Sequence, residues 1–161
     1  MNSPFTNINV DRNSDWLKDH LQKAIDSPTQ TFSEISLLKD QGLYMIFNEI
    51  DLLYVGKTNR NGKIRLRELT TDFRSHSFNR KYLAELIQTK GHGYHNLSSN
   101  KKKELIETGI LTEFEFKEYQ AEVNSNIKTN LKFKFYSFSL SVDLVHLEHY
   151  AISVLKPLYN D

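Results

Sequence analysis

The sequence predicts an α+β domain in which a small, mainly antiparallel β-sheet is flanked by α-helices. Two apolar runs separated by a short polar break indicate a hairpin, apolar and charged residues alternate again near residue 131, and apolar residues elsewhere recur at helical spacing. The 161 residues, 39% hydrophobic and 25% charged, are enough for one hydrophobic core and indicate a soluble globular protein.

The predicted hairpin lies between Gly42 and Gly56. Its apolar runs, Leu43 to Phe47 and Leu52 to Val55, flank polar residues 48–51, and each run carries a tyrosine close to a glycine. Phenols at Tyr44 and Tyr54 near residues that lack a Cβ predict side chains aimed into a site that backbone or ligand approaches closely. The alternative is a pair of amphipathic tyrosines in an ordinary hairpin.

The N-terminal part is expected to be an extension with one helix, covering residues 1–40 and followed by a domain over residues 41–161. Residues 1–12 show no periodicity and are expected to be a loose terminus. Ser14 is a candidate cap for a helix running to about Ile25, which Ser27-Pro28 would end.

The segment between residues 57 and 81 is strongly basic, with eight basic residues against two acidic ones in a chain whose net charge is only +1. A polar loop over residues 57–62 is expected to lead into a helix with Leu66, Leu69 and Phe73 on its apolar side. At about 100° per residue, Arg65 falls about 65° from the centre of that side and Arg67 about 135° from it. Arg65 is therefore expected at the edge of the buried face, and Arg67 in solvent.

Four further elements are expected before residue 143. A second amphipathic helix should end near Lys90-Gly91, and a short helix should begin at residues 101–103. The alternation of phenylalanine and glutamate in Thr112 to Tyr119 predicts a half-exposed strand. A second alternating segment begins at Leu131, and its change of phase at Tyr136 predicts a bulge or two short strands.

The last predicted helix carries a carboxylate on its apolar side. Asp143 is a plausible cap, and the helix should stop before Pro157. Glu148 falls about 40° from Leu144 on a helical wheel, inside the apolar arc. Either an ion pair or incomplete burial of this helix edge explains the position, or Glu148 is a ligand for a hard divalent cation. Histidines 146 and 149 project to the opposite side and are expected at the surface.

These features, in this order, resemble the GIY-YIG nuclease family over residues 41–160. Gly42-Leu43-Tyr44 and Tyr54-Val55-Gly56 stand for the two triplets that name the family. They are followed by a lysine, a helix with an arginine at its inner edge, and a late helix with a glutamate that precedes a proline and an asparagine; in this chain these are Lys57, Arg65, Glu148, Pro157 and Asn160.

The resemblance implies a metal-dependent DNA endonuclease that hydrolyses phosphodiester bonds. Tyr44 would orient or deprotonate the attacking water, which is difficult for a phenol with an ordinary pKa of about 10. Lys57 or the metal-bound network would favour the ionised phenol, and Tyr54 would help to position the water or the phosphate.

The remaining roles that the resemblance implies concern the phosphate and its surroundings. Arg65 and Arg67 compete for the position that braces the scissile phosphate, and the helical wheel favours Arg65. Glu148 would hold Mg²⁺ or Mn²⁺, and Asn160 would close the site structurally or by hydrogen bonding. The DNA backbone would be bound by basic residues that make binding salt-sensitive. These are Arg67, Arg74, Arg80 and Lys81.

Some features leave alternatives open. Many family members have a histidine a few residues after the arginine, where this chain has Thr70 and Thr71, so its role is missing or displaced to His76. A catalytically inactive nucleic-acid-binding module on the same fold, or an interaction domain with a solvated basic helix, would share much of the pattern.

Composition sets the remaining expectations. The absence of cysteine excludes a disulfide scaffold and thiolate zinc sites, and fits a cytoplasmic protein without a membrane span. The DNA target and the choice between monomer and homodimer are not predicted.

Overall fold

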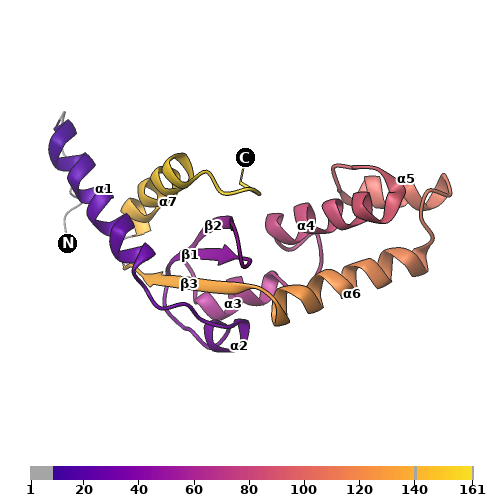
Figure 1. The fold of residues 1–161 in the computed structure, drawn as a ribbon, viewed down its shortest axis with the longest axis horizontal. Coiled ribbons are helices and arrows are strands. Elements are labelled where there is room, and N and C mark those ends of the chain that lie inside the picture. The colour runs from indigo at the N-terminus through magenta and orange to yellow at the C-terminus, as the bar shows by residue number, and fades with distance from the viewer. Residues whose placement is uncertain (1–8, 140, 161) are drawn as a thin grey trace. The chain divides into compact units, whose positions relative to one another are not determined.

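A computed structural model describes residues 9–139 and 141–160 and shows an α+β fold. Within these residues it contains a three-stranded antiparallel sheet and seven α-helices, the first of them near the N-terminus (Figure 1). The chain forms two compact units, one of residues up to 65 together with those from 131 onward, the other of residues 66–130. The first is called the sheet unit below, and the second the helical unit.

The predicted hairpin is confirmed and forms two thirds of the sheet. Strand β1 (Gly42–Phe47) pairs antiparallel with β2 (Leu52–Thr58) on one side and with β3 (Lys132–Ser137) on the other, giving the order β2-β1-β3. The turn is closed by the Asn48 side-chain oxygen, which accepts hydrogen bonds from the backbone N–H groups of residues 50 and 51 at 2.8 and 2.6 Å. Since β2 extends to Thr58, Lys57 lies in a strand and not in the predicted loop.

The bulge or strand break predicted at Tyr136 is wrong. Strand β3 pairs with β1 in one unbroken register, and the irregularity lies instead between β1 and β2 at Ile46 and Phe47. The change of phase in the sequence arises because β3 ends at Ser137. Phe138 then donates its backbone N–H to the Gln41 carbonyl at 3.0 Å and turns into the core.

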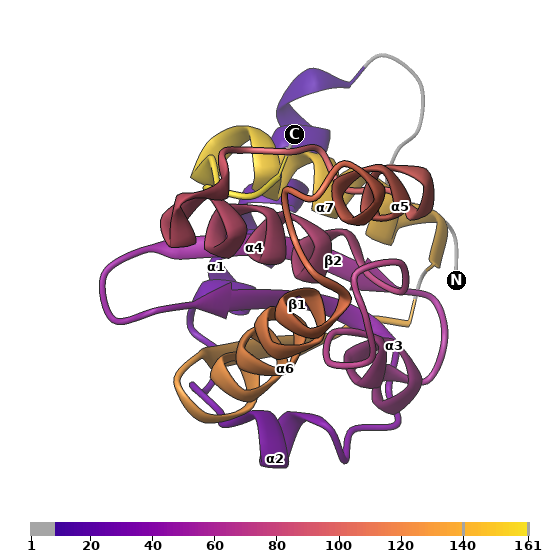
Figure 2. The ribbon, with the colours of Figure 1, turned by 90° about the vertical axis from the view of Figure 1, so that its right-hand side faces the viewer.

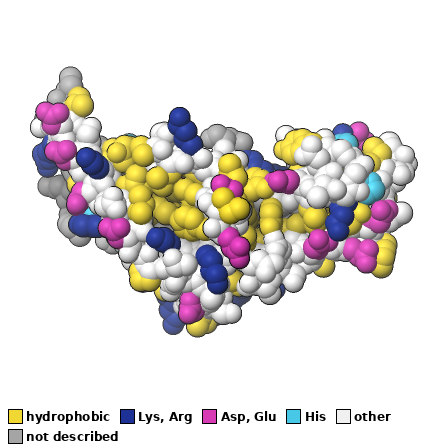
Figure 3. All heavy atoms as spheres, in the orientation of Figure 1, with side chains coloured by type: hydrophobic (Ala, Val, Ile, Leu, Met, Phe, Trp, Pro, Cys, Tyr) yellow, Lys and Arg dark blue, Asp and Glu magenta, His cyan; other side chains and the backbone are white. Residues whose placement is uncertain are grey.

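One face of the sheet is covered by α1 (Val10–Ile25) and α7 (Ser141–Leu155), and the other by the short helix α2 (Phe32–Ile35) (Figures 1 and 2). Hydrophobic side chains gather in Figure 3 where α7 lies beside the sheet. The core between the sheet, α1 and α7 is formed by Leu21, Ala24, Leu43, Met45, Val55, Phe138, Leu144, Leu147 and Ala151. Its burial supplies the main attraction that holds both helices to the sheet.

The predicted N-terminal helix is confirmed, but it begins earlier than expected. The side chain of Asn9 caps α1 by accepting a hydrogen bond from the Arg12 N–H at 2.9 Å, so Ser14 lies inside the helix. Residues 10–12 are therefore helical, and residues 1–8 of the predicted loose terminus lie outside the described residues. Helix α2, absent from the prediction, begins with a capping box between Thr31 and Glu34.

The helix expected after the hairpin is α3 (Gly62–Glu68), which is shorter than its apolar pattern suggested. Leu66 lies in the helix, while Leu69 and Phe73 lie in the turns that follow it, and all three side chains are buried. The apolar spacing therefore marks buried residues, but only the first of them lies in the helix.

The helical unit contains α4 (Ser77–Ile87), a π-helical turn η1 (Gln88–His92), α5 (Ser99–Glu107) and α6 (Glu113–Thr129). The first two are the predicted helix that ends near Gly91, and the predicted short helix is α5. The strand predicted over residues 112–119 is wrong, because these residues cap and begin α6. Thr112 and Glu115 form a capping box, and Phe116 is buried while Phe114 is 68% exposed.

A buried amide network joins α4 to α6 within the helical unit. The Asn79 side-chain NH₂ donates to the Leu69 carbonyl at 2.6 Å and to Asn124 at 2.8 Å. The Gln120 side chain donates to Asn79 at 2.9 Å and accepts from the Phe73 N–H at 2.9 Å. Both ends of the fully buried Asn79 amide are thus satisfied, as a buried polar group requires.

Helix α7 ends before Pro157, as predicted, with Lys156 in a left-handed conformation at φ 48°. Asp143 is not its cap. It lies in the first turn of the helix and is buried. Among the described residues, no helix is long and apolar enough to cross a membrane.

Candidate active site

Tyr44 and Tyr54 lie on the same face of neighbouring strands. Tyr44 pairs with Gly56 across the β1–β2 ladder, which places Tyr54 diagonally opposite. The two rings are stacked at an interplanar angle of 30°, with 6.2 Å between their centroids. Tyr54 is 9% exposed and Tyr44 is fully buried.

The glycine at position 56 makes room for the first phenol. A Cβ on Gly56 would meet the ring of Tyr44 and its hydroxyl oxygen. Because the Tyr44 ring occupies the space above β2, the close approach expected from the tyrosine and glycine spacing is present. Position 56 therefore requires the absence of a side chain, and not a special backbone angle.

Arg65 on α3 reaches the same phenol. Its guanidinium forms a side-chain hydrogen bond with Tyr44. Arg65 is partly buried and Arg67 is exposed, which confirms the two positions predicted from the helical wheel. Of the two arginines, Arg65 is the one whose contact with Tyr44 the structure establishes.

Glu148 on α7 is partly buried beside the end of β2. The backbone N–H of Lys57 donates a hydrogen bond to its carboxylate, and the charges of Lys57, His149 and Arg65 favour the ionised form. Burial outweighs these contributions and raises the pKa of Glu148. A further cation beside this carboxylate would therefore stabilise its ionised form.

The pKa of Tyr44 is raised well above its ordinary value. Burial is the main cause, the neighbouring Tyr54 adds to it, and the Arg65 charge and hydrogen bond oppose it. Tyr44 is consequently a neutral phenol at physiological pH. A neutral phenol can donate a hydrogen bond, which is what the first of the two roles implied by the resemblance requires.

The end of the chain covers the outer edge of β2. The backbone N–H groups of residues 158 and 159 donate to the carbonyls of Leu52 and Leu53 at 3.2 and 2.8 Å. The Asn160 side chain accepts from the Val55 N–H and donates to the Val55 carbonyl, both at 2.8 Å. Asn160 thus takes the place of a neighbouring strand at Val55. Val55 lies two residues before Lys57, whose backbone N–H binds Glu148.

The predicted site residues fall into two groups. Five of them lie in the sheet unit and interact with at least one other member, and Asn160 is fixed to the strand that carries two of them. The five are Tyr44, Tyr54, Lys57, Arg65 and Glu148. The residues predicted to bind DNA belong to the helical unit and are Arg67, Arg74, Arg80 and Lys81.

Two residues of the basic segment, Arg74 and His76, have structural roles that the sequence did not indicate. Arg74 forms a salt bridge with Asp72 at 2.7 Å, so its charge is already paired. His76 is buried and caps α4, where its Nδ1 accepts a hydrogen bond from the Phe78 N–H at 3.0 Å. The Nδ1 atom of His76, the alternative for the missing histidine, is thus already engaged in the cap of α4.

The donor set for a metal at this site is small. No three His, Asp or Glu side chains of the described residues converge on one point, and the histidines at 146 and 149 are exposed, as predicted. Glu148 would be the single protein ligand. That suits Mg²⁺, which keeps several water molecules and is commonly held by one or two carboxylates together with substrate phosphate.

No protein-family model, curated protein or solved structure matches this chain.

Proposed function

We propose that this protein is a metal-dependent DNA endonuclease that hydrolyses phosphodiester bonds. The observation that carries the proposal is the junction of Tyr44, Arg65 and Glu148, which come from β1, α3 and α7 and act on one another within the sheet unit. A water-orienting phenol, a phosphate-binding cation and a metal-binding carboxylate are the groups that this hydrolysis needs.

The two tyrosines prepare the attacking water. Burial keeps the Tyr44 phenol neutral, and the stacked Tyr54 restricts the position of its ring. Tyr44 orients the water by hydrogen bonding, and Arg65, which is bonded to the same phenol, lies next to the attack position. Since Tyr44 has no exposed surface, the water reaches it after neighbouring side chains move.

Arg65 stabilises the charge that develops on the phosphate. Its planar guanidinium can donate two hydrogen bonds to phosphate oxygens, which a lysine at the same position could not do in this geometry. Lys57 contributes its backbone N–H to Glu148, and its side-chain charge favours the ionised carboxylate.

Glu148 would hold Mg²⁺ or Mn²⁺. Partial burial of an acid with a raised pKa fits a cation site, because a divalent ion offsets the cost of the buried charge. When bound, such an ion supplies charge neutralisation at the leaving oxygen. The position of Glu148 is set by α7 and by its hydrogen bond from β2.

The exposed basic residues would bind the DNA backbone. Arg67 is exposed at the end of α3, and Arg80 and Lys81 are partly exposed on α4. Arg74 would bind a phosphate at the expense of its salt bridge with Asp72. Binding should weaken as salt increases, since phosphate contacts release counterions.

The test is cleavage of supercoiled plasmid by the purified protein. Nicking or linearisation that requires Mg²⁺, stops in EDTA and is lost in Glu148→Gln would support the proposal. If Glu148→Gln retains metal-dependent cleavage, then Glu148 is not the metal ligand.

The complete burial of Tyr44 favours a second candidate, a non-catalytic nucleic-acid-binding module on the same fold. In such a module the tyrosine pair and Arg65 would stabilise the sheet, and the basic residues would bind nucleic acid. Salt-dependent retention of DNA in a gel shift, with no cleavage by the folded protein in Mg²⁺ or Mn²⁺, would favour this module over the nuclease.

A further inference from the structure

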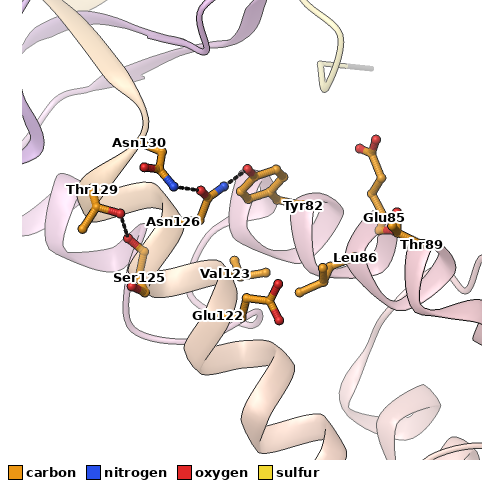
Figure 4. A pocket seen from close by; sticks show the side chains of 10 residues that line it. All are labelled: Tyr82, Glu85, Leu86, Thr89, Glu122, Val123, Ser125, Asn126, Thr129 and Asn130. Atoms are coloured by element: carbon orange, nitrogen blue, oxygen red, sulfur yellow. Dashed lines mark hydrogen bonds between the residues drawn. The ribbon is translucent and has the colours of Figure 1, made fainter.

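A second site lies in the helical unit, in a pocket of about 460 Å³ between α4 with η1 on one side and α6 on the other (Figure 4). Its volume is within the range of small-molecule sites. Its apolar wall consists of Tyr82, Leu86 and Val123. None of the residues proposed for phosphodiester hydrolysis lines this pocket.

The amide groups of the pocket already have partners. Asn126 donates to the Tyr82 hydroxyl and accepts from Asn130, so that the three side chains form a chain along one wall (Figure 4). Tyr82 is also stacked on Phe78, with 5.4 Å between the ring centroids. This wall is therefore fixed in position before any ligand binds.

The hydroxyl groups of the two threonines can only accept further hydrogen bonds. Thr89 donates its hydroxyl proton to the Glu85 carbonyl at 2.9 Å, and Thr129 donates to the Ser125 carbonyl at 2.8 Å. A hydroxyl has one proton to donate, and its remaining lone pair can accept from a ligand. Both threonines therefore add acceptors to the pocket.

The charged groups of the pocket are both acidic. Glu85 lines it from α4 and Glu122 from α6, and Glu122 already binds one ammonium group, that of Lys90 at 3.3 Å. Burial and, to a smaller extent, the charge of Glu85 raise the pKa of the Tyr82 phenol, and in Figure 4 the Glu85 carboxylate points away from that of Glu122. A phosphate-bearing ligand would be repelled here, and no third acidic or histidine ligand of the described residues completes a metal site.

We propose that this pocket binds a linear organic cation, an ammonium or guanidinium group carried on an aliphatic chain. One cationic group would donate hydrogen bonds to Glu122 and, in a ligand with two such groups, the second would donate to Glu85, which lies apart from Glu122 in Figure 4. The aliphatic chain between them would lie against the apolar wall. The same chemistry is offered by a free diamine or guanidino compound and by the arginine side chain of a peptide.

The test is a titration of the ¹⁵N-labelled full-length protein with agmatine, followed by NMR. We expect saturable shifts confined to amides of residues 82–89 and 122–130. Glutarate, a dicarboxylate of similar length, should produce none. A parallel titration with a short arginine-containing peptide distinguishes the two sources, because the natural kind of ligand should bind more tightly.

Two variants test the assigned contacts. Glu85→Gln should weaken agmatine binding about tenfold, the loss expected for one charge-assisted hydrogen bond. Glu118→Gln, on α6 but outside the pocket, changes the net charge equally and should leave binding intact.

The proposal is overturned if agmatine gives no saturable shifts, or if the shifts lie outside the pocket. An equal loss in Glu118→Gln and Glu85→Gln would also overturn it, since the binding would then be non-specific attraction to an acidic surface. Thermal melting of each variant shows whether a loss of binding reflects loss of the fold.

Discussion

The ring of Tyr44 fills the space that a side chain at Gly56 would occupy. This relationship links the two triplets of the hairpin, Gly42-Leu43-Tyr44 and Tyr54-Val55-Gly56. Because Gly56 has no side chain, the Tyr44 ring can lie across strand β2. The phenol can then meet Arg65 on α3. The position of Tyr44 in the proposed site therefore requires a glycine at position 56.

Gly56→Ala should destabilise the protein by about 1–3 kcal/mol, the usual cost of overpacking a filled core. Urea denaturation measures this cost. In a Tyr44→Phe background the same substitution should cost less, because the hydroxyl oxygen is one of the atoms that the new Cβ meets. Equal costs in both backgrounds would show that the hydroxyl oxygen of Tyr44 is not the obstacle.

Glu148→Gln should make the protein more stable at pH 7 and equally stable near pH 4. Burial raises the pKa of Glu148 in the folded state, so the stability associated with its protonated form is fully present below the unfolded pKa. That stability is lost as the pH rises through the folded pKa, whereas glutamine has no charge to bury. Urea denaturation of both proteins from pH 4 to 8 tests this, and a variant less stable at pH 7 would contradict it.

Asn160→Ala should lower stability by about 1–2 kcal/mol, because it leaves the N–H and carbonyl of Val55 without their partner. The change should be local, so hydrogen exchange at the Val55 amide should accelerate more than exchange in α4. Asn59→Ala, at an exposed position after β2, is the matched control and should change neither quantity. Unchanged protection at Val55 would show that Asn160 does not hold the strand edge.

Asn79→Ala should cost about 2–4 kcal/mol, more than the Asn160 change, since the Asn79 side chain is fully buried. The substitution removes donors to the Leu69 carbonyl and to Asn124, and the acceptor of Gln120. Thermal or urea unfolding measures the cost, with exposed Asn100→Ala as the control. A cost equal to that of the control would mean that the network does not stabilise the helical unit.

The hairpin and the inner position of Arg65 could be predicted because each depends on local periodicity. Alternation fixes which residues share a face of a strand, and a helical turn fixes the angle between Arg65 and Arg67. The same reasoning failed at residues 112–119, where two phenylalanines in alternate positions suggested a strand. The capping box at Thr112 and Glu115 was the local signal for the helix that forms there.

Contacts between distant segments could not be predicted from spacing. The sequence pattern places Glu148 on the inner side of α7, but its hydrogen bond from Lys57 depends on how α7 lies along the sheet. The attachment of Asn160 to Val55 likewise depends on the path of the chain after Pro157. The amide network around Asn79 joins three separate segments, and none of them carries a pattern that indicates the others.

The most direct test of the proposed site is the single-turnover rate of plasmid nicking in Mg²⁺ with saturating protein, compared between Arg65→Ala and Arg67→Ala. The two residues share a helix and a charge, but only Arg65 is bonded to Tyr44 in the proposed site. We expect Arg65→Ala to lower the rate about 100-fold or more, as loss of a transition-state donor does, and Arg67→Ala to weaken DNA binding while retaining the rate at saturation. The reverse order, or the absence of metal-dependent cleavage by the folded wild-type protein, would contradict the proposed site.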